Sequence, residues 1–125
     1  MSKRVLLAED EPHIIESLSF LLGRAGFEIS TEMSGARALE RALSNPPDVM
    51  LVDVMLPELD GFEMLRQLRA DPRTKELPVV MLTAKGQRED RDRAENLGAD
   101  VFITKPFSNA DVVDTVIRLT KNGRT

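Results

Sequence analysis

The sequence predicts an α/β fold, in which five parallel strands alternate with five helices in one doubly wound domain. Four short runs rich in aliphatic residues show no alternation with polar residues, which is typical of strands buried on both faces. The runs lie at residues 5–8, 49–52, 79–82 and 101–104. Helical patterns and clusters of turn residues separate them, as expected for parallel strands joined by crossover helices.

The segment after the first run predicts a helix and then an edge strand. Pro12 suits the first turn of the helix, while Gly23 and Gly26 mark its far end. Apolar residues recur in between at helical spacing, at Ile14, Leu18, Leu21 and Leu22. Residues 27–32 alternate between apolar and polar, which favours a strand at the sheet edge with one solvated face.

Two further helices are predicted on either side of the second buried run. The first covers residues 34–44 and stops at Asn45, because the two prolines that follow cannot continue a helix. Its apolar stripe consists of Ala38, Leu39, Ala42 and Leu43. The other begins after Asp60 and Gly61 and ends before Pro72. Its apolar residues are Phe62, Leu65 and Leu68.

The last two helices differ in composition. The helix expected at residues 88–97 opens with six charged residues in succession and has few apolar ones, chiefly Ala94 and Leu97. We therefore expect it to be the least firmly packed. The final helix is expected at residues 109–120. Its apolar face consists of Val113, Val116, Ile117 and Thr120, widened by Val112 and Leu119.

These elements amount to five βα units in a single domain. The alternating strand belongs at one edge of the sheet and the short run at residues 101–104 at the other. This arrangement fits the flavodoxin-like strand order 2-1-3-4-5, with helices on both faces. We expect one domain over residues 1–125, with its core at about 3–121. Since little follows the end of the last helix near Thr120, no output domain is expected.

Composition and charge limit the class of protein. The 125 residues, 42% hydrophobic and 30% charged, are typical of a globular domain, and the lack of cysteine excludes disulfides and thiolate metal sites. A net charge of −4 argues against nucleic acid as a direct partner, since binding to phosphates needs a basic surface. No apolar run approaches a membrane span of roughly 20 residues, and none is long enough for a signal peptide. We therefore expect a cytoplasmic protein without membrane insertion.

Each buried run ends on polar residues suited to phosphoryl transfer. The first run leads into Glu9 and Asp10, and the other three lead into Asp53, Thr83 and Lys105. At the carboxyl ends of parallel strands these residues would meet at one edge, where open sheets bind ligands. Two carboxylates ~4 Å apart repel by about 4 kcal/mol at an effective dielectric constant of about 20. A Mg²⁺ ion would relieve this repulsion, and Lys105 would add a second positive charge.

Such a site could transfer a phosphoryl group to Asp53. Its carboxylate could attack phosphorus in line and form an aspartyl phosphate, because this chemistry depends mainly on positioning and charge neutralisation. The hydroxyl of Thr83 could donate a hydrogen bond to the phosphoryl group. The small Ala84 next to it leaves room for the phosphate.

Five motifs follow one another from the first strand to the last helix. They are Glu9-Asp10-Glu11-Pro12, Leu51-Val52-Asp53-Val54-Met55-Leu56-Pro57 with Asp60-Gly61, Leu82-Thr83-Ala84, Gly98-Ala99-Asp100 and Lys105-Pro106-Phe107. Each alone is weak, but in this order and at these intervals they are specific. Together they resemble the receiver domain of two-component response regulators, in its single-domain chemotaxis type.

The resemblance implies a role for each acidic residue. Asp53 would be the phosphoacceptor. Asp10 and Asp53 would bind Mg²⁺ together with the main-chain carbonyl of Met55, while Glu9 would act through water. Such a domain is a regulatory phosphoacceptor that catalyses only its own phosphorylation and dephosphorylation.

The resemblance also implies how a signal enters and leaves. Lys105, joined to Pro106 by a cis bond, would hold the phosphate. Thr83 and Phe102 would form the switch pair, in which the hydroxyl moves to the phosphate and the ring turns inward. The partners would be a histidine kinase or phosphotransfer protein and an unidentified target that meets the surface of the last two helices and the last strand. The domain would be a monomer or would dimerise on phosphorylation.

Two positions depart from the commonest family pattern, and two others lie where the family varies. Glu9 stands where Asp is more usual, a longer carboxylate that the family tolerates. Phe102 stands where Tyr is frequent, so the switch would depend on packing without a ring hydroxyl. Met55 and Lys85 lie two residues after site residues, where side chains modulate hydrolysis of the phosphoryl group. Because Met cannot position a water and Lys85 could screen one, we expect slow to moderate loss of phosphate.

Other interpretations of these residues are open from the sequence. Asp10 could be only the N-cap of the first helix, Asp53 only a strand end, and Lys105 only a surface lysine. A Mg²⁺-dependent phosphohydrolase would also form an aspartyl phosphate, although such enzymes hold a second Asp where this chain has Met55. A third alternative is a receiver-like binding module that is never phosphorylated. His13, the sole histidine, is interpreted as a solvated residue, with a phosphorelay or metal role as the minor alternative.

Overall fold

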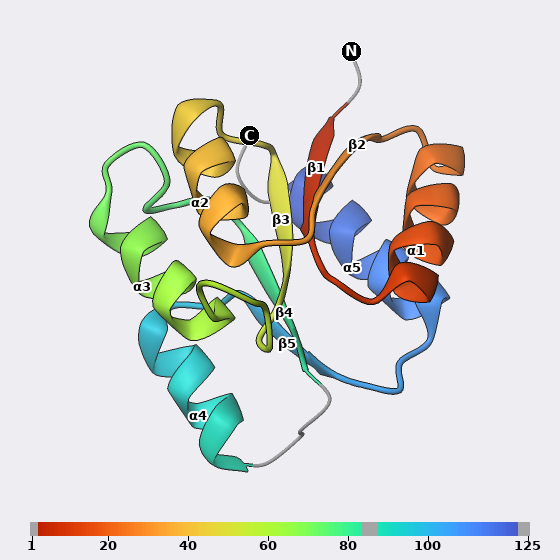
Figure 1. Cartoon of the computed structure of the whole chain (residues 1–125). Helices are drawn as coiled ribbons and strands as arrows, with labels where there is room; N and C mark the ends of the chain where they lie inside the picture. The colour runs from red at the N-terminus through yellow and green to blue at the C-terminus, as the bar shows by residue number, and fades with distance from the viewer. Residues whose placement is uncertain (1–2, 84–87, 123–125) are drawn as a thin grey trace.

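Five strands and five helices alternate along the chain in a computed structural model that describes residues 3–83 and 88–122 (Figure 1). The strands are β1 (Arg4–Ala8), β2 (Glu28–Glu32), β3 (Val49–Asp53), β4 (Val79–Thr83) and β5 (Val101–Thr104). The helices are α1 (Pro12–Arg24), α2 (Gly35–Ser44), α3 (Gly61–Ala70), α4 (Arg88–Leu97) and α5 (Asn109–Asn122). All strand pairs are parallel and the order is β2-β1-β3-β4-β5. The predicted doubly wound fold is therefore confirmed.

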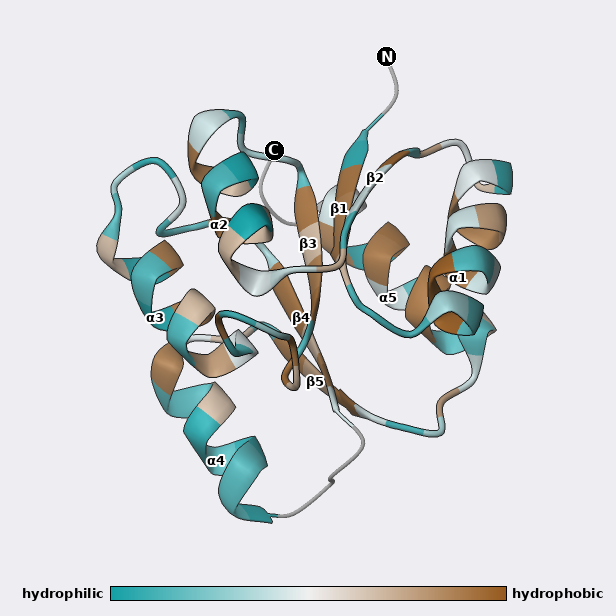
Figure 2. Ribbon diagram, in the orientation of Figure 1, coloured by the Kyte–Doolittle hydropathy of each residue, from teal (hydrophilic) through white to brown (hydrophobic). Residues whose placement is uncertain are grey.

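Helices cover both faces of the sheet. In Figure 1, α1 and α5 lie on one side and α2, α3 and α4 on the other. Alternation along β3 accounts for the two layers, because Met50 and Val52 pack toward α2, α3 and α4, whereas Val49 and Leu51 pack toward α1 and α5. Figure 2 shows accordingly that the central strands are hydrophobic while the outer helix faces are hydrophilic.

The sheet has a buried centre and an exposed edge. All five residues of β3 are buried, whereas none of the five residues of β2 is fully buried. This difference confirms the interpretation of the alternating segment as an edge strand. The sheet therefore buries the carboxyl end of its central strand, at Asp53, in the middle of the fold.

Each helix buries one stripe and leaves the rest to solvent. In α1 the fully buried residues are Leu18 and Leu22, one turn apart. In α4 only Ala94 is fully buried, which confirms that this helix has the weakest apolar packing. Among the residues that the structure describes, no helix combines the length and the apolar composition that crossing a membrane requires.

The inner face of α5 differs from the predicted one. Val112 and Val116 are fully buried and face the sheet with the predicted Val113 and with Leu119 partly buried beside them, whereas Ile117 lies outside the apolar cluster. The expected centre of the stripe was therefore displaced by one position. The cause is a wide apolar face on this helix, so that packing against α1 and the sheet selects the inner stripe.

Candidate functional site

The strand ends gather the predicted site residues at one edge of the sheet. Ala8 of β1 is paired with Val52 of β3, so that Glu9 and Asp53 follow at the same level. Thr83 of β4 is paired with Thr104 of β5, which places Lys105 directly after that pair. The structure thus brings together residues that are far apart in the sequence, as parallel pairing predicts.

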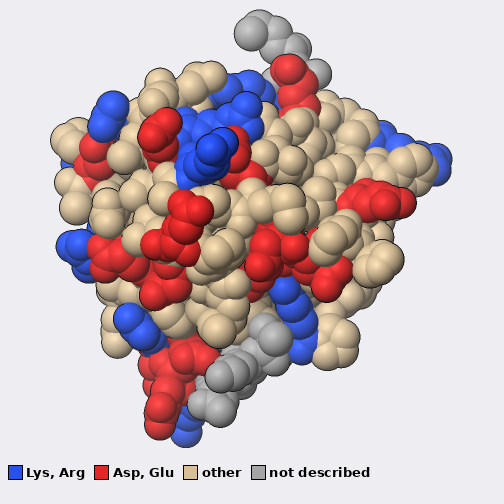
Figure 3. Space-filling view, viewed as in Figure 1, with Lys and Arg blue, Asp and Glu red and all other residues tan. Residues whose placement is uncertain are grey.

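Three carboxylates form the centre of the site. One oxygen from each of Glu9, Asp10 and Asp53 lies within 4.8 Å of the others, a spacing that allows a metal ion to be held between them. Figure 3 shows acidic side chains gathered in the middle of this face, next to basic ones. Oxygen-only donors of this kind suit a hard cation such as Mg²⁺.

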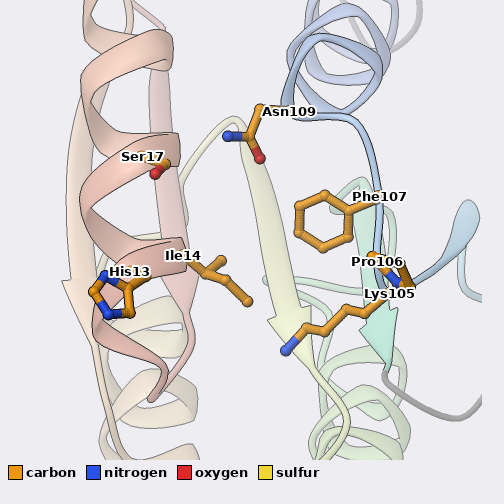
Figure 4. Close-up of a pocket in the computed structure, with 7 residues that line it drawn as sticks. All are labelled: His13, Ile14, Ser17, Lys105, Pro106, Phe107 and Asn109. Atoms are coloured by element: carbon orange, nitrogen blue, oxygen red, sulfur yellow. The ribbon is translucent and has the colours of Figure 1, made fainter.

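Lys105 lies against this cluster. Its Nζ is 3.2 Å from Glu9 Oε1 and 3.4 Å from Asp53 Oδ2. Its amide nitrogen donates to the carbonyl of Thr83 at 2.6 Å, and its bond to Pro106 is cis, as expected. In Figure 4 the Lys105 side chain reaches from the loop after β5 back toward the end of the yellow strand, β3. The ammonium therefore contacts both buried carboxylates and is not a surface lysine.

Glu9 is the site residue whose pKa is clearly shifted from its usual value. It is fully buried, and its Oε2 accepts a hydrogen bond from the Glu11 amide at 3.1 Å, while Oε1 has no hydrogen-bond partner. Lys105 Nζ donates a hydrogen bond to Oε2 at 3.4 Å and forms an ion pair with Oε1 without a hydrogen bond to it. Burial, reinforced by the charge of Asp53, raises the pKa of Glu9 from 4.5 to about 7. A buried carboxylate with an oxygen that lacks a hydrogen bond has a free acceptor position that a cation can take.

The two aspartates have different surroundings. Asp53 is 4% exposed, and its Oδ1 accepts a hydrogen bond from the Met55 amide at 3.2 Å. Asp10 is the most exposed of the three carboxylates. The alternative that Asp10 caps the first helix is wrong, because the N-cap of α1 is Glu11, whose side chain accepts from the His13 amide at 3.0 Å. The side chain of Asp10 is therefore left to the acidic cluster.

The proposed switch pair lies beside the acidic site. Met81 is paired with Phe102 and Thr83 with Thr104, so Thr83 and Phe102 project from the same face of the sheet, toward α3 and α4. Thr83 is buried, whereas Phe102 is partly buried against the α3 and α4 layer. The geometry is compatible with coupling between the two side chains through that face.

Two contacts between arginines of α4 and aromatic rings were not found from the sequence. Arg91 places its guanidinium 5.4 Å from the centre of the Phe102 ring, and Arg93 stacks at 4.4 Å over Phe62. Both belong to the charged run of α4, where a solvated face is the usual interpretation. Only the packing of α4 shows which arginines turn toward the rings.

Two other candidates lie apart from the carboxylates or outside the described residues. His13 is exposed on α1 and lines a pocket with Ile14 and Phe107 between α1 and the loop before α5 (Figure 4). This position matches its interpretation as a solvated residue. Lys85, predicted to modulate hydrolysis, lies outside the described residues, as does Ala84.

Comparison with known families identifies the fold and the motifs together. The family model of the response regulator receiver domain matches residues 5–117. The chain belongs to the receiver domain family of response regulators. The alkaline phosphatase synthesis transcriptional regulatory protein PhoP of Bacillus subtilis is 41% identical over 112 residues, which are 90% of this chain and 46% of PhoP. The chain thus spans about half the length of the curated relatives it matches first.

Solved structures show the same receiver fold. A putative response regulator from Chloroflexus aurantiacus is 32% identical, with a TM-score of 0.90 over 96% of this chain and 98% of its own. The receiver domain of the sensor histidine kinase PA1611 from Pseudomonas aeruginosa is 28% identical, with a TM-score of 0.83 over 96% and 98% of the two chains. Its structure has a magnesium ion coordinated in the active site cleft. The present receiver domain therefore shares both fold and family with these proteins.

Proposed function

We propose that this receiver domain is a phosphorylation-controlled switch whose Asp53 accepts a phosphoryl group from a histidine kinase or phosphotransfer protein. The observation that carries the proposal is the contact of Lys105 with two buried carboxylates, Glu9 and Asp53, at 3.2 and 3.4 Å. A structural ion pair needs one carboxylate per lysine. A second carboxylate and the nearby Asp10 leave an excess of negative charge that a cation would balance.

The donors at this edge fit Mg²⁺. Asp10 and Asp53 would bind it directly with the main-chain carbonyl of Met55, and Glu9 would act through water. The unsatisfied Oε1 of Glu9 and its raised pKa support a cation at this place. When bound, Mg²⁺ neutralises the carboxylates and the incoming phosphoryl oxygens. The magnesium ion in the PA1611 receiver supports the same assignment here.

The chain's own residues then carry out the transfer. An Asp53 carboxylate oxygen attacks phosphorus, an O–P bond forms, and the N–P bond to the histidine of the donor breaks, leaving the imidazole as the leaving group. Lys105 stays within reach of the phosphoryl oxygens and offsets their charge. The hydroxyl of Thr83 turns toward the phosphoryl group and donates a hydrogen bond. In this way the domain promotes its own phosphorylation and dephosphorylation without turning over another substrate.

The output is proposed to be a protein contact. Movement of Thr83 toward the phosphate would let Phe102 turn inward and change the surface of α4, β5 and α5. That surface would bind an unidentified target protein, and phosphorylation would leave the domain a monomer or make it a dimer. The net charge of −4 disfavours direct contact with nucleic acid, and a cytoplasmic location suits a kinase donor. We propose that residues 1–125 form one such receiver unit.

Intact-mass analysis tests the central proposal. After incubation with Mg²⁺ and acetyl phosphate, the protein is expected to gain the mass of one phosphoryl group, and Asp53→Asn is expected to gain none. No adduct on the parent protein, or an equal adduct on the variant, would contradict the proposal. Release of many equivalents of phosphate per protein would instead indicate a phosphohydrolase.

A further inference from the structure

The loop between β3 and α3, residues 54–60, is fixed at both of its ends. The Val54 amide donates to the Leu82 carbonyl, and the Gly61 amide donates to the Val54 carbonyl, each at 2.9 Å. Between these bonds lies Met55, whose side chain is 60% exposed. A main-chain carbonyl oxygen can change its position only when the backbone itself moves, unlike a side-chain ligand, which can change its rotamer. The place of the Met55 oxygen therefore depends on how the backbone of this loop is supported.

The first turn of α2 supports the middle of the loop. The Gly35 amide donates to the Pro57 carbonyl at 3.0 Å, and the same oxygen accepts from the Leu59 amide at 2.8 Å. This tight turn has Glu58 at its centre, with φ of 70°. The Ser34 hydroxyl also donates to Glu58 Oε1 at 3.0 Å. Two hydrogen bonds thus join a helix outside the acidic site to the loop beside it.

The contact at Gly35 leaves no room for a side chain. A Cβ atom at this position would lie 1.7 Å from the Leu59 carbonyl oxygen and 2.7 Å from its carbon. Both atoms are backbone, so the clash cannot be relieved by a change of rotamer. A methyl group at position 35 would have to push the loop away from α2. At Gly23, by contrast, a Cβ would meet nothing within 4 Å.

We propose that Gly35 is a positioning residue for the metal site, because its bare backbone seats the β3–α3 loop and so places the Met55 carbonyl. The inference rests on the proposed function, in which that carbonyl is a ligand of Mg²⁺. A side chain at position 35 would shift the loop while Asp10 and Asp53 stay where the strand ends hold them.

The affinity for Mg²⁺ in the absence of any phosphodonor tests this inference. We expect Gly35→Ala to weaken Mg²⁺ binding roughly tenfold, as loss of a supporting group beyond the ligands typically does, when binding is followed by amide NMR shifts. Gly23→Ala is the matched control and is expected to bind Mg²⁺ as the parent does. In labelling with acetyl phosphate, the Mg²⁺ concentration for half-maximal rate should rise for Gly35→Ala, while the rate at saturating Mg²⁺ returns toward that of the parent. A glycine needed only for folding would lower Tm without moving the Mg²⁺ affinity, and that result would overturn the inference.

A second pair of variants acts from the loop side and does not depend on Gly35→Ala being stable. Glu58→Ala removes the acceptor of the Ser34 bond, and we expect a loss of Mg²⁺ affinity of about threefold. Glu58→Gln removes the charge but keeps an acceptor oxygen, and it should bind Mg²⁺ nearly as the parent does. Equal affinities for the two variants would overturn the inference. If the parent protein binds Mg²⁺ and is labelled on Asp53 while all variants match it, only this inference fails; if the parent does neither, the proposed function fails with it.

Discussion

The guanidinium of Arg91 lies 5.4 Å from the centre of the Phe102 ring, on the face of β5 that is turned toward α4. Because Phe102 has no hydroxyl, its ring is held by packing and by this cation–π contact, without a hydrogen bond of its own. The orientation of Phe102, the proposed switch residue, therefore depends in part on a charged side chain of the least firmly packed helix.

Removing this cation is expected to loosen the switch. A cation–π contact at a partly exposed site stabilises by about 0.5–1 kcal/mol, so Arg91→Gln should raise the rate of labelling by acetyl phosphate about two- to fivefold. The rate is measured by intact mass at fixed Mg²⁺. Arg91→Lys keeps a cation near the ring and should stay close to the parent. Equal rates for the parent and Arg91→Gln would show that the arginine does not restrain the ring.

The raised pKa of Glu9 predicts pH-dependent binding of Mg²⁺. Below about pH 7 the buried carboxyl holds a proton that must leave when a cation binds, so affinity should rise from pH 6 toward pH 7 and level off above it. Mg²⁺ titrations at a series of pH values measure this. Glu9→Gln should bind more weakly and show no such rise. A parent affinity that is flat over this range would contradict the pKa shift.

The same carboxyl should destabilise the metal-free protein at alkaline pH. The pKa of Glu9 is about 7 in the folded state and 4.5 in the unfolded chain. Between these two pH values the folded state therefore binds a proton that the unfolded chain has released. Stability from this group is therefore complete below pH 4.5 and is lost as the pH rises through 7. In EDTA, Glu9→Gln should have a higher Tm than the parent at pH 8 and a smaller advantage at pH 5. An advantage that is the same at both pH values would rule out this ionisation as the cause.

A polar network at the opposite end of the strands is expected to hold the α4–β5 turn. Asp100 Oδ2 accepts from the Val79 amide at 2.8 Å and from Arg69 at 3.2 Å, and Arg69 also donates to the Gly98 carbonyl. Asp100→Ala removes the carboxylate to which the Val79 amide and Arg69 donate, at a largely buried position. The free energy of unfolding, measured by urea denaturation, should therefore fall by about 2–4 kcal/mol. Mg²⁺ affinity should not change. Arg73→Ala, which breaks an exposed ion pair, is the control and should cost far less.

The phosphoryl group on Asp53 is expected to persist for minutes or longer. The Met55 side chain is exposed at the site and has no group that can orient an attacking water. Met55→Gln supplies such a group and should shorten the lifetime, measured by intact mass after phosphodonor is removed. Decay within seconds in the parent would contradict the expectation.

The sequence predicted the sheet and the meeting of the site residues, because uninterrupted apolar runs mark buried parallel strands and their ends follow from pairing. Asp53, Thr83 and Lys105 each lie directly after or at the end of such a run. The resemblance to the family added features that the spacing of residues leaves open. One of them is the cis bond between Lys105 and Pro106, which the structure confirms.

The remaining features depend on packing between elements, which no local pattern encodes. Ile117 looks as apolar as Val116, and only contact with α1 and the sheet decides which of them turns inward. Arg91 looks like any other charged residue of α4 until its place over Phe102 is known. The support of the β3–α3 loop by Gly35 joins segments more than twenty residues apart and leaves no periodic signal.

The alternation along β3 has a further consequence. Since Met50 and Val52 belong to one apolar layer and Val49 and Leu51 to the other, the backbone of the sheet separates two apolar clusters that have no residue in common within residues 3–83 and 88–120. Substitutions such as Leu18→Val in one layer and Leu65→Val in the other should therefore add in their effects on stability. A loss of packing in either layer then lowers the same free energy of unfolding, while the side chains of the other layer keep their own contacts.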